Sequence, residues 1–261
     1  MPNLLEVKQV TKKFGGVVAN KDITFSFEEG NVVGLIGPNG AGKSTLFNMV
    51  SSIFPPTEGE IWFDGKRIDR LPSYKIAPLG IARTFQNLQV FKRMTVLENV
   101  MVGLHTNSKS GILSAAFKLP GAKKEEQKMY EQAWEELKFV GLEDVADVEA
   151  GNLPLGKLRL LELARALATR PKLLLLDEIA AGLNHNETAA MSDLILQVRK
   201  RGVSIFVVEH DMDLVMRVSD QIVVLDQGEK IAQGTPKEVQ NDRRVIEAYL
   251  GTEEEEEEVS L

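Results

Sequence analysis

Nine consecutive residues near the start of the chain have the composition of a phosphate-binding loop. They fit the pattern G-x-x-x-x-G-K-S/T and are Gly37, Pro38, Asn39, Gly40, Ala41, Gly42, Lys43, Ser44 and Thr45. In such a loop the glycines let successive backbone N–H groups surround phosphate oxygens, the lysine neutralises the phosphate charge, and the first hydroxyl can ligate Mg²⁺. The pattern predicts a nucleotide-phosphate site with Ser44 as a ligand of Mg²⁺.

A second candidate group lies in the later half of the chain, where an apolar run ends in Asp177 and Glu178. The first carboxylate suits Mg²⁺, held directly or through water, and the second suits polarising an attacking water. An apolar strand followed by two acids is by itself usually only a strand that meets solvent. Together with the phosphate-binding loop, the two acids predict a P-loop ATPase.

The segments around these residues predict the elements that position them. The apolar residues 31–36 predict a buried strand entering the loop, and residues 44–50 predict a helix leaving it, with its positive dipole end towards the anion. Further buried strands of a parallel sheet are predicted at residues 172–177, 204–209 and 221–226, with helical patterns between them. We therefore expect an α/β fold with the ligand at the carboxyl ends of the strands.

Two other regions have a different pattern. Residues 4–29 alternate apolar and polar residues, and residues 60–64 form a similar run, which predicts an antiparallel β subdomain beside the main sheet. Residues 92–170 predict an inserted helical subdomain, in which residues 106–123 carry loop-forming sequence. One helix of this subdomain ends near Gly141 and has an apolar face made of Tyr130, Ala133, Trp134, Leu137 and Val140.

Capping boxes with the spacing T-x-x-E mark two helix starts, at residues 95–98 and 235–238. The second is followed directly by a proline, which suits the first position of a helix. We expect one helix to begin inside the helical subdomain and another near the C-terminus.

Composition sets further limits. The 261 residues have room for one large α/β domain, and the net charge of −7 argues against a nucleic-acid partner. Residues 253–258 are all glutamate, so we expect residues 252–261 to be an acidic, disordered tail. The absence of cysteine excludes disulfides and thiolate metal sites. No run of 18 apolar residues and no leader pattern is present, so we expect a cytoplasmic protein.

With these motifs in place, residues 4–251 closely resemble the nucleotide-binding subunits of ABC transporters. The resemblance implies that Phe14 stacks on adenine, that Gln86 contacts Mg²⁺ and links the site to the helical subdomain, and that His210 stabilises the γ-phosphate. Asn184, in the loop after the two acids, would contact an opposing subunit. The implied cofactors are ATP and Mg²⁺, and the implied domain is a single ABC nucleotide-binding domain over residues 1–251.

One segment departs from the usual pattern of this family. Where many members have Leu-Ser-Gly-Gly-Gln, this chain has Leu153, Pro154, Leu155, Gly156 and Lys157, followed by an apolar helix at residues 158–169. In the family, this helix faces the γ-phosphate bound by a second subunit. Because Pro154 has neither a hydroxyl nor an N–H, the phosphate contact would rest on the remaining backbone donors near Gly156, on the helix dipole and on the charge of Lys157.

Several segments resemble one branch of the family, the ATP-binding subunits of branched-chain amino acid importers (LivG type). These are the Leu-Pro-x-Gly segment, residues 82–88, residues 180–184, the inserted loop and the ending at residues 247–251. The branch commonly has proline where this chain has Ile179, for which we expect only a local backbone effect. The implied assembly contains two membrane permeases, two ATP-binding subunits of the same or different sequence, and an external solute-binding protein. The chain would lie on the inner face of the membrane.

Other functions remain open at this point. Related importers take urea, short amides or other amino acids. A clamp or regulator acting on DNA or ribosomes is disfavoured because the chain lacks a long heptad insertion, a tandem second nucleotide domain and a basic stripe. A P-loop small-molecule kinase is disfavoured by the combination of Gln86, Glu178 and His210. Docking on a membrane permease through residues 87–105 would distinguish an importer from the clamp or regulator and from the kinase.

Overall fold

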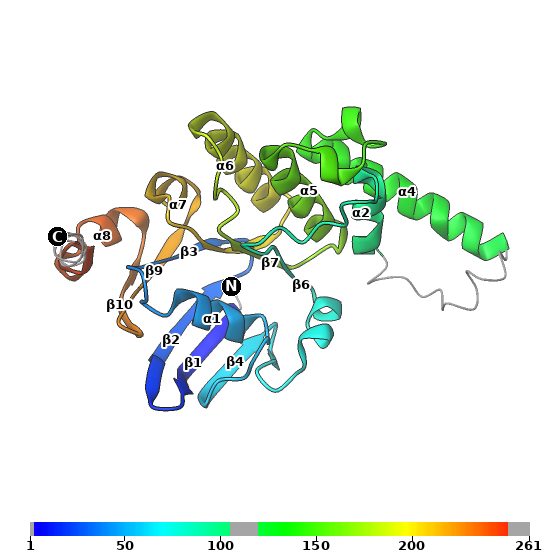
Figure 1. The fold of residues 1–261 in the computed structure, drawn as a ribbon. Helices are drawn as coiled ribbons and strands as arrows, with labels where there is room; N and C mark the ends of the chain where they lie inside the picture. Colours follow the sequence, from blue (N-terminus) through cyan, green and yellow to red (C-terminus); the bar gives the residue numbers. More distant parts are fainter. Residues whose placement is uncertain (1–2, 105–119, 250–261) are drawn as a thin grey trace.

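The computed structural model describes residues 3–104 and 120–249, without the side chains of residues 120–125. It has two sheets with helices around them (Figure 1). The smaller sheet is antiparallel, with strand order β2-β1-β4-β5. Its strands are β1 (Asn3–Phe14), β2 (Val17–Glu28), β4 (Glu58–Phe63) and β5 (Lys66–Arg67). This sheet is the antiparallel β subdomain expected from the alternating pattern of the first residues.

The larger sheet has the strand order β10-β9-β3-β8-β7-β6. Its strands are β3 (Val32–Ile36), β6 (Ile81–Arg83), β7 (Leu173–Asp177), β8 (Ser204–Val208), β9 (Gln221–Asp226) and β10 (Glu229–Gly234). All neighbours pair in parallel except β10, which pairs antiparallel with β9. The sheet is therefore mixed, with one antiparallel edge strand, and it confirms the expected fold class.

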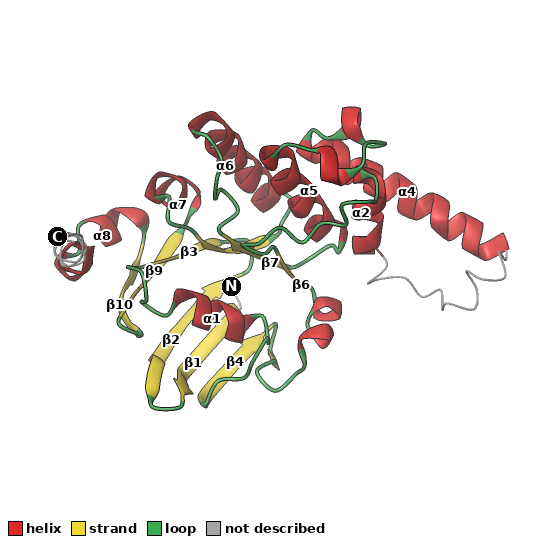
Figure 2. Ribbon diagram, viewed as in Figure 1, coloured by secondary structure: helices red, strands yellow, loops and turns green. Residues whose placement is uncertain are grey.

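Both faces of the parallel part of the large sheet are buried, and alternate residues of its strands enter different cores. On β7, Leu173 and Leu175 lie in the core shared with the small sheet, whereas Leu174 and Leu176 lie in the core under the helices. Helix α1 (Lys43–Val50) lies between the two sheets (Figure 2) and fills the first core with Phe47. These strands are near-continuous apolar runs because both of their faces are covered.

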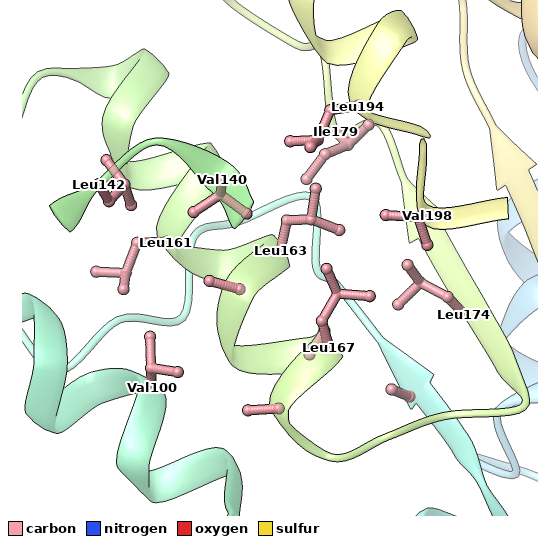
Figure 3. Packing of buried hydrophobic residues seen from close by; sticks show 14 of the residues in the cluster. Val100, Val140, Leu142, Leu161, Leu163, Leu167, Leu174, Ile179, Leu194 and Val198 are labelled. Carbon is pink, nitrogen blue, oxygen red and sulfur yellow. The ribbon is translucent and has the colours of Figure 1, made fainter. Parts of the chain in front are cut away.

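The helical layer covers the opposite face of the large sheet (Figure 2). It contains α2 (Val96–Leu104), α4 (Pro120–Val140), α5 (Leu155–Ala168) and α6 (His185–Lys200). Figure 3 shows how its core joins these helices to β7 in one cluster, which includes Val100, Val140, Leu142, Leu161, Leu163, Leu167, Leu174, Ile179, Leu194 and Val198. Ile179 is fully buried in this cluster. The region between β6 and β7 is therefore an inserted helical unit packed directly behind the strand that ends in the two acids.

The remaining elements are short. Helices α7 (Met212–Val218) and α8 (Pro236–Gln240) flank β9 and β10 in the chain. The 3₁₀ turns are η1 (Ser73–Lys75), η2 (Ala77–Leu79), η4 (Glu143–Val145) and η5 (Ala150–Asn152). Among the described residues, no helix is long and apolar enough to span a membrane.

Both expected capping boxes are present. The Thr95 hydroxyl accepts the Glu98 N–H at 3.1 Å, and the Glu98 carboxylate accepts the Thr95 N–H at 2.8 Å. Thr235 and Glu238 do the same at the start of α8, with a proline in the first helical turn. These reciprocal bonds use backbone donors that have no partner inside the helix.

Three sequence-based expectations need correction, and two others concern residues outside the description. Residues 120–123 are not loop, because they form the first turn of α4, where proline is tolerated since no helical N–H bond is lost. Tyr130, expected on the apolar face of this helix, is 43% exposed and stacks on Trp134 at the edge of the cluster. Helix α5 begins at Leu155, three residues earlier than expected. Residues 106–119 and the acidic tail lie outside the described residues.

Helices α2 and α5 cross at Gly103. A Cβ atom on Gly103 would lie 2.4 Å from the backbone oxygen of Arg165. We expect Gly103→Ala to lower the free energy of unfolding by about 1–3 kcal/mol, because overpacking against a fixed backbone outweighs the gain in helix propensity. Chemical denaturation measures this change. Gly16→Ala is the control, because a Cβ atom there has nothing within 4 Å. Equal stability of the two variants would contradict the close crossing.

Candidate functional site

The candidate residues meet because four parallel strands end at one edge of the large sheet. β3 leads into the phosphate-binding loop, β6 leads towards Gln86, β7 ends in Asp177 and is followed by Glu178, and β8 is followed two residues later by His210. In an open α/β sheet the carboxyl ends of parallel strands form the ligand-binding edge. The strand register thus assembles residues that are far apart in the sequence.

The phosphate-binding loop is confined by its neighbours at two glycines. A Cβ atom on Gly37 would lie 2.0 Å from the Leu225 backbone oxygen, and one on Gly42 would lie 2.4 Å from the Ala19 backbone oxygen. Gly42 also has a φ of 91°, in the left-handed region, and is the N-cap of α1. Only glycine fits at these positions, so the loop holds one shape with the first turn of α1 at its end.

Lys43 is buried and donates to the loop itself. Its Nζ lies 2.6 Å from the Gly37 carbonyl oxygen and 2.8 Å from the Pro38 carbonyl oxygen. Burial lowers the pKa of Lys43, and the negative charge of Glu178 opposes this effect. The ammonium group therefore lies within the loop, close enough to Glu178 for their charges to interact.

Glu178 is the central side chain of the site. Its Oε2 accepts a hydrogen bond from Gln86 Nε2 at 2.7 Å, and its Oε1 lies 2.9 Å from His210 Nε2. The residue has a φ of 48°, which is unusual for a residue with a side chain. Its N–H donates to the Val208 carbonyl oxygen at 2.9 Å and so continues the pairing of β7 with β8. Gln86 and His210 thus hold the carboxylate, and the bond to Val208 holds the Glu178 backbone.

Asp177 has a partner that the sequence did not indicate. Arg83 Nη2 donates to Asp177 Oδ2 at 2.7 Å, and Arg83 Nη1 donates to Asn48 Oδ1 at 2.8 Å and to Ser51 Oγ at 2.6 Å. The guanidinium also lies over the Phe85 ring, 5.2 Å from its centroid. This arginine joins β6, β7 and α1 and fixes the orientation of the Asp177 carboxylate. The only signal in the sequence was a charged residue at the end of a short buried strand.

The donor set at this edge suits Mg²⁺ shared with a nucleotide. Ser44 is exposed in the first turn of α1, and Arg83 bonds Oδ2 of Asp177, which leaves Oδ1 for a cation. Within residues 3–104 and 120–249 no group of three or more His, Cys, Asp or Glu could hold a metal ion. Mg²⁺ typically uses one or two carboxylates and takes other ligands from phosphates and water. The residues present fit that arrangement.

Comparison with known families identifies the fold. Residues 20–181 match the family described as ABC transporter. The chain belongs to the ABC transporter family. Residues 229–255 also match the family described as branched-chain amino acid ATP-binding cassette transporter. As a member of the ABC family with a complete phosphate-binding loop, the chain is an ATPase subunit.

Individual relatives agree over nearly the whole chain. The high-affinity branched-chain amino acid transport ATP-binding protein BraF of Pseudomonas aeruginosa is 45% identical over 95% of this chain and 98% of that protein. The corresponding protein LivG of Escherichia coli strain K12 is 41% identical over 95% of this chain and 98% of that protein.

Solved structures agree as well. An ABC transporter ATP-binding cassette in its ADP conformation has a TM-score of 0.84 and 33% identity, covering 96% of this chain and 100% of that one. A dimeric bacterial ABC transporter cassette has a TM-score of 0.76 and 27% identity, covering 89% of this chain and 98% of that one.

Within this ABC fold, Phe14 is an exposed aromatic ring at the end of β1, with 48% of its surface accessible. It meets the Phe54 ring edge to face at 5.5 Å. Lys12, two residues earlier, pairs with Asn20, and the Asn20 amide donates to the Gly42 carbonyl oxygen at 3.2 Å. Phe14 is therefore near the phosphate-binding loop and is not a core residue.

Residues 153–157, which the sequence predicts as the signature segment, lie apart from this group. Pro154 is the N-cap of α5, so the N–H groups of the next three residues have no partner inside the helix. A Cβ atom on Gly156 would lie 2.6 Å from Glu187 Oε1, and one on Gly182 would lie 2.7 Å from Leu155 Cδ2. Within the described chain this helix start packs against the region after Glu178, and no hydrogen bond joins it to the phosphate-binding loop.

Asn184 has a local structural partner. It is the N-cap of α6, and its side chain accepts the Glu187 N–H at 3.1 Å in a complete capping box. This bond fixes the end of the loop that begins at Glu178. The bond to Glu187 would therefore already fix the Asn184 side chain if it contacted a second subunit.

Glu209 is a second buried charged residue at this edge that the sequence did not single out. It lies between β8 and His210 and is 4% exposed. Its Oε1 accepts the Ala180 N–H at 2.7 Å, which ties this strand end to the loop after Glu178. Burial raises the pKa of Glu209 to about 7, and the nearby charges of Glu178 and Asp211 act in the same direction.

This shift predicts a pH dependence of stability. The unfolded chain loses the Glu209 proton near pH 4.5, whereas the folded protein keeps it until about pH 7. The folded state therefore loses stability across this window, by up to about 3 kcal/mol. We expect Glu209→Gln, which can still accept the Ala180 N–H, to be more stable than the parent at pH 8 by about 1–3 kcal/mol and no more stable near pH 4.5.

Denaturant titrations at the two pH values measure this difference. Glu135→Gln, on an exposed position of α4, is the matched control. Parallel stability curves for the parent and Glu209→Gln across the window would show that Glu209 does not titrate in this way.

Proposed function

We propose that this chain hydrolyses ATP to power the import of branched-chain or related amino acids through partner permeases. The observation that carries the proposal is the Glu178 carboxylate, held by Gln86 at 2.7 Å and His210 at 2.9 Å at the same sheet edge as the phosphate-binding loop. Phosphoryl transfer depends mainly on positioning and on electrostatic stabilisation. A preset carboxylate beside a phosphate site suits that requirement.

In this proposal the backbone N–H groups of residues 39–45 and the dipole of α1 hold the phosphates. Lys43 exchanges its carbonyl partners for the β- and γ-phosphate oxygens, which are stronger acceptors for a buried ammonium. Its lowered pKa reflects the cost of burying that charge, and a bound phosphate would offset this cost. Phe14, exposed beside the loop, supplies an apolar ring for the adenine.

Ser44, Asp177 and Gln86 would hold Mg²⁺, which would supply charge neutralisation on the phosphate oxygens. Arg83 keeps one Asp177 oxygen occupied, so the other oxygen has a defined direction. Gln86 would contact both the ion and Glu178, to which it already donates a hydrogen bond.

Glu178 orients and polarises the attacking water, and His210 contacts the γ-phosphate. The hydrogen bond between the two side chains holds Glu178 in a single orientation before water binds. The left-handed backbone at Glu178 is the kind of local strain that active sites retain.

A second ATP-binding subunit completes the proposed site. The N–H groups of Leu155, Gly156 and Lys157 at the start of α5 have no partner inside the helix and would form an anion site for the nucleotide of a partner. A solved relative is a dimeric ABC transporter cassette. Pro154 removes a hydroxyl but not one of these three donors, because the N-cap residue precedes them.

The proposed substrate class comes from the relatives, whose names describe branched-chain amino acid transport. Substrate choice in such an importer would lie in the permeases and in an external solute-binding protein. The alternative is a related importer that takes urea, short amides or other amino acids and has the same kind of assembly. The chain would work on the inner face of the membrane, bound to its permeases.

A groove of about 590 Å³ is the proposed permease site. It lies between the end of β6, the segment after Gln86, α2 and α5, and its lining is largely apolar, with Phe91, Val102 and Ile53 among its residues. Phe91 is 49% exposed and Ile53 is 51% exposed. The groove adjoins the Gln86 segment, so an occupant there would act directly on the proposed site.

We expect Glu178→Gln to bind ATP but to lose turnover by about 100-fold or more, because the amide cannot accept the water proton. It should also form a stable ATP-bound dimer. Phosphate release and light scattering with ATP and Mg²⁺ measure the two effects. Turnover near the parent rate would show that Glu178 is not the base.

Purification from native membranes tests the transport proposal. The tagged chain should bring multi-span permeases and a second ATP-binding chain, identified by mass spectrometry. Phe91→Glu should lose the permeases while keeping ATP binding, because a charge would enter the apolar groove. Ile246→Glu, at an exposed apolar position outside the groove, is the control. Recovery only with ribosomes or nucleic acid would overturn the importer proposal and leave the ATPase assignment in place.

A further inference from the structure

Helix α5 carries a buried pair of opposite charges outside the residues discussed so far. Arg159 is 4% exposed and Glu162 is 2% exposed. Arg159 Nη1 lies 3.6 Å from Glu162 Oε2, one helical turn along α5. Two charges in this environment require specific partners, because removing them from water costs several kcal/mol each. Their partners indicate what the pair does.

Both side chains bond the backbone of Phe85. The Phe85 N–H donates to Glu162 Oε1 at 3.0 Å, and Arg159 Nη1 donates to the Phe85 carbonyl oxygen at 3.2 Å. Phe85 directly precedes Gln86. Helix α5 therefore holds both polar backbone groups of the residue before the glutamine that bonds Glu178.

Arg159 also bonds the loop on the other side of Glu178. Its Nη2 donates to the Ala181 carbonyl oxygen at 3.4 Å. Ala181 is in turn held by a bond from its N–H to the Glu178 carbonyl oxygen at 3.1 Å. A single guanidinium thus connects the segment before Gln86 to the segment after Glu178.

The pair is not fully satisfied in this arrangement. Arg159 Nε is buried and has no hydrogen-bond partner among the described residues, and Glu162 Oε2 makes no hydrogen bond closer than its 3.6 Å ion pair with Arg159 Nη1. Glu162 also lines the proposed permease groove. A buried polar network with open positions changes its bonding when its surroundings move, because each unpaired group favours a new partner. The network lies between the groove and the catalytic carboxylate.

We propose that Arg159 and Glu162 are positioning residues that make α5 and the two loops move as one unit, so that a displacement of α5 moves Gln86 and the segment after Glu178 together relative to the phosphate-binding loop. The inference rests on the proposed roles of Gln86 and Glu178. In this proposal, the two α5 side chains connect the permease groove to the site of Gln86 and Glu178. A purely structural pair would stabilise the helical layer without affecting the order of these loops relative to the core.

The test compares Arg159→Met and Glu162→Gln with the parent chain. Arg201→Met is the matched control. Arg201 also joins two parts of the helical layer through a glutamate, because its Nη1 lies 2.7 Å from Glu136 Oε2. Unlike Arg159, it bonds neither loop. For each protein, steady-state kinetics gives kcat and KM for ATP, and titration gives the ATP affinity. Hydrogen–deuterium exchange follows the peptides covering residues 83–90 and 179–184.

We expect Arg159→Met to lower kcat by about tenfold to a hundredfold, with ATP affinity within about twofold, because the catalytic groups are misplaced while the phosphate-binding loop is intact. Exchange should become faster in both loop peptides. Glu162→Gln keeps an acceptor for the Phe85 N–H, so its loss of kcat should be smaller. The double variant should be no slower than Arg159→Met alone, because both changes break one link.

Arg201→Met should change thermal stability without changing kcat or the exchange of either loop. If Arg159→Met loses stability but keeps the parent kcat and the parent exchange in both loops, the pair is only structural and the proposal is wrong. If Arg159→Met does not fold, Arg159→Lys replaces it, since an ammonium can reach one carbonyl but not both. Parent-like turnover of Glu178→Gln would refute the proposed base separately, while the exchange measurement would still report the link.

Discussion

The carboxylate of Glu178 is the contact on which the geometry of the site depends. It accepts from Gln86 and meets His210, and these residues follow β6 and β8, the strands on either side of β7. The register of the parallel strands sets this meeting, since Asp177 pairs with Val208 and Leu175 pairs with Arg83. A slip of one residue in either pair would turn alternate side chains to the opposite face and separate the three groups. The apolar packing on both faces of the sheet therefore determines the chemistry at its edge.

This edge is held by polar groups that have been removed from water. Lys43, Asp177, Arg159, Glu162 and Glu209 are all less than 9% exposed. Each is compensated by specific bonds: Lys43 by loop carbonyls, Asp177 by an arginine, and Glu209 by backbone N–H groups. The compensation is incomplete, because the pKa of Glu209 is raised to about 7 and Arg159 retains an unpaired buried nitrogen. Such networks are rigid when fully paired, and their unpaired members are where a ligand or a helix displacement has the largest effect.

The elements and the loop were predictable from sequence because their signals are local. The glycine spacing, the apolar strands and the capping boxes each follow from the conformation of a few adjacent residues. The partners of the charged residues were not predictable. Arg83 and Asp177, or Arg159 and Phe85, meet only after the helical layer has packed on the sheet, and no local pattern encodes which carbonyl a guanidinium reaches. At the start of α4 the local signal was misleading. Its Leu-Pro-Gly sequence resembles a turn, but proline is acceptable in a first helical turn.

The departure at the signature segment can be understood from the same geometry. Pro154 has φ −66° and ψ 159°, which is extended backbone suitable for an N-cap and compatible with the proline ring. The position needs no N–H of its own, so proline removes only the side-chain hydroxyl that a serine would supply. A Cβ atom on Gly156, two residues later, would lie 2.6 Å from Glu187 Oε1, so the Glu187 side chain packs directly against the start of α5. The proline therefore moves the proposed recognition of a partner's phosphate from a side-chain hydroxyl to backbone N–H groups and to the charge of Lys157. Because α5 carries both this helix start and the Arg159–Glu162 pair, a phosphate bound there would restrain the same helix that holds the Gln86 and Ala181 loops.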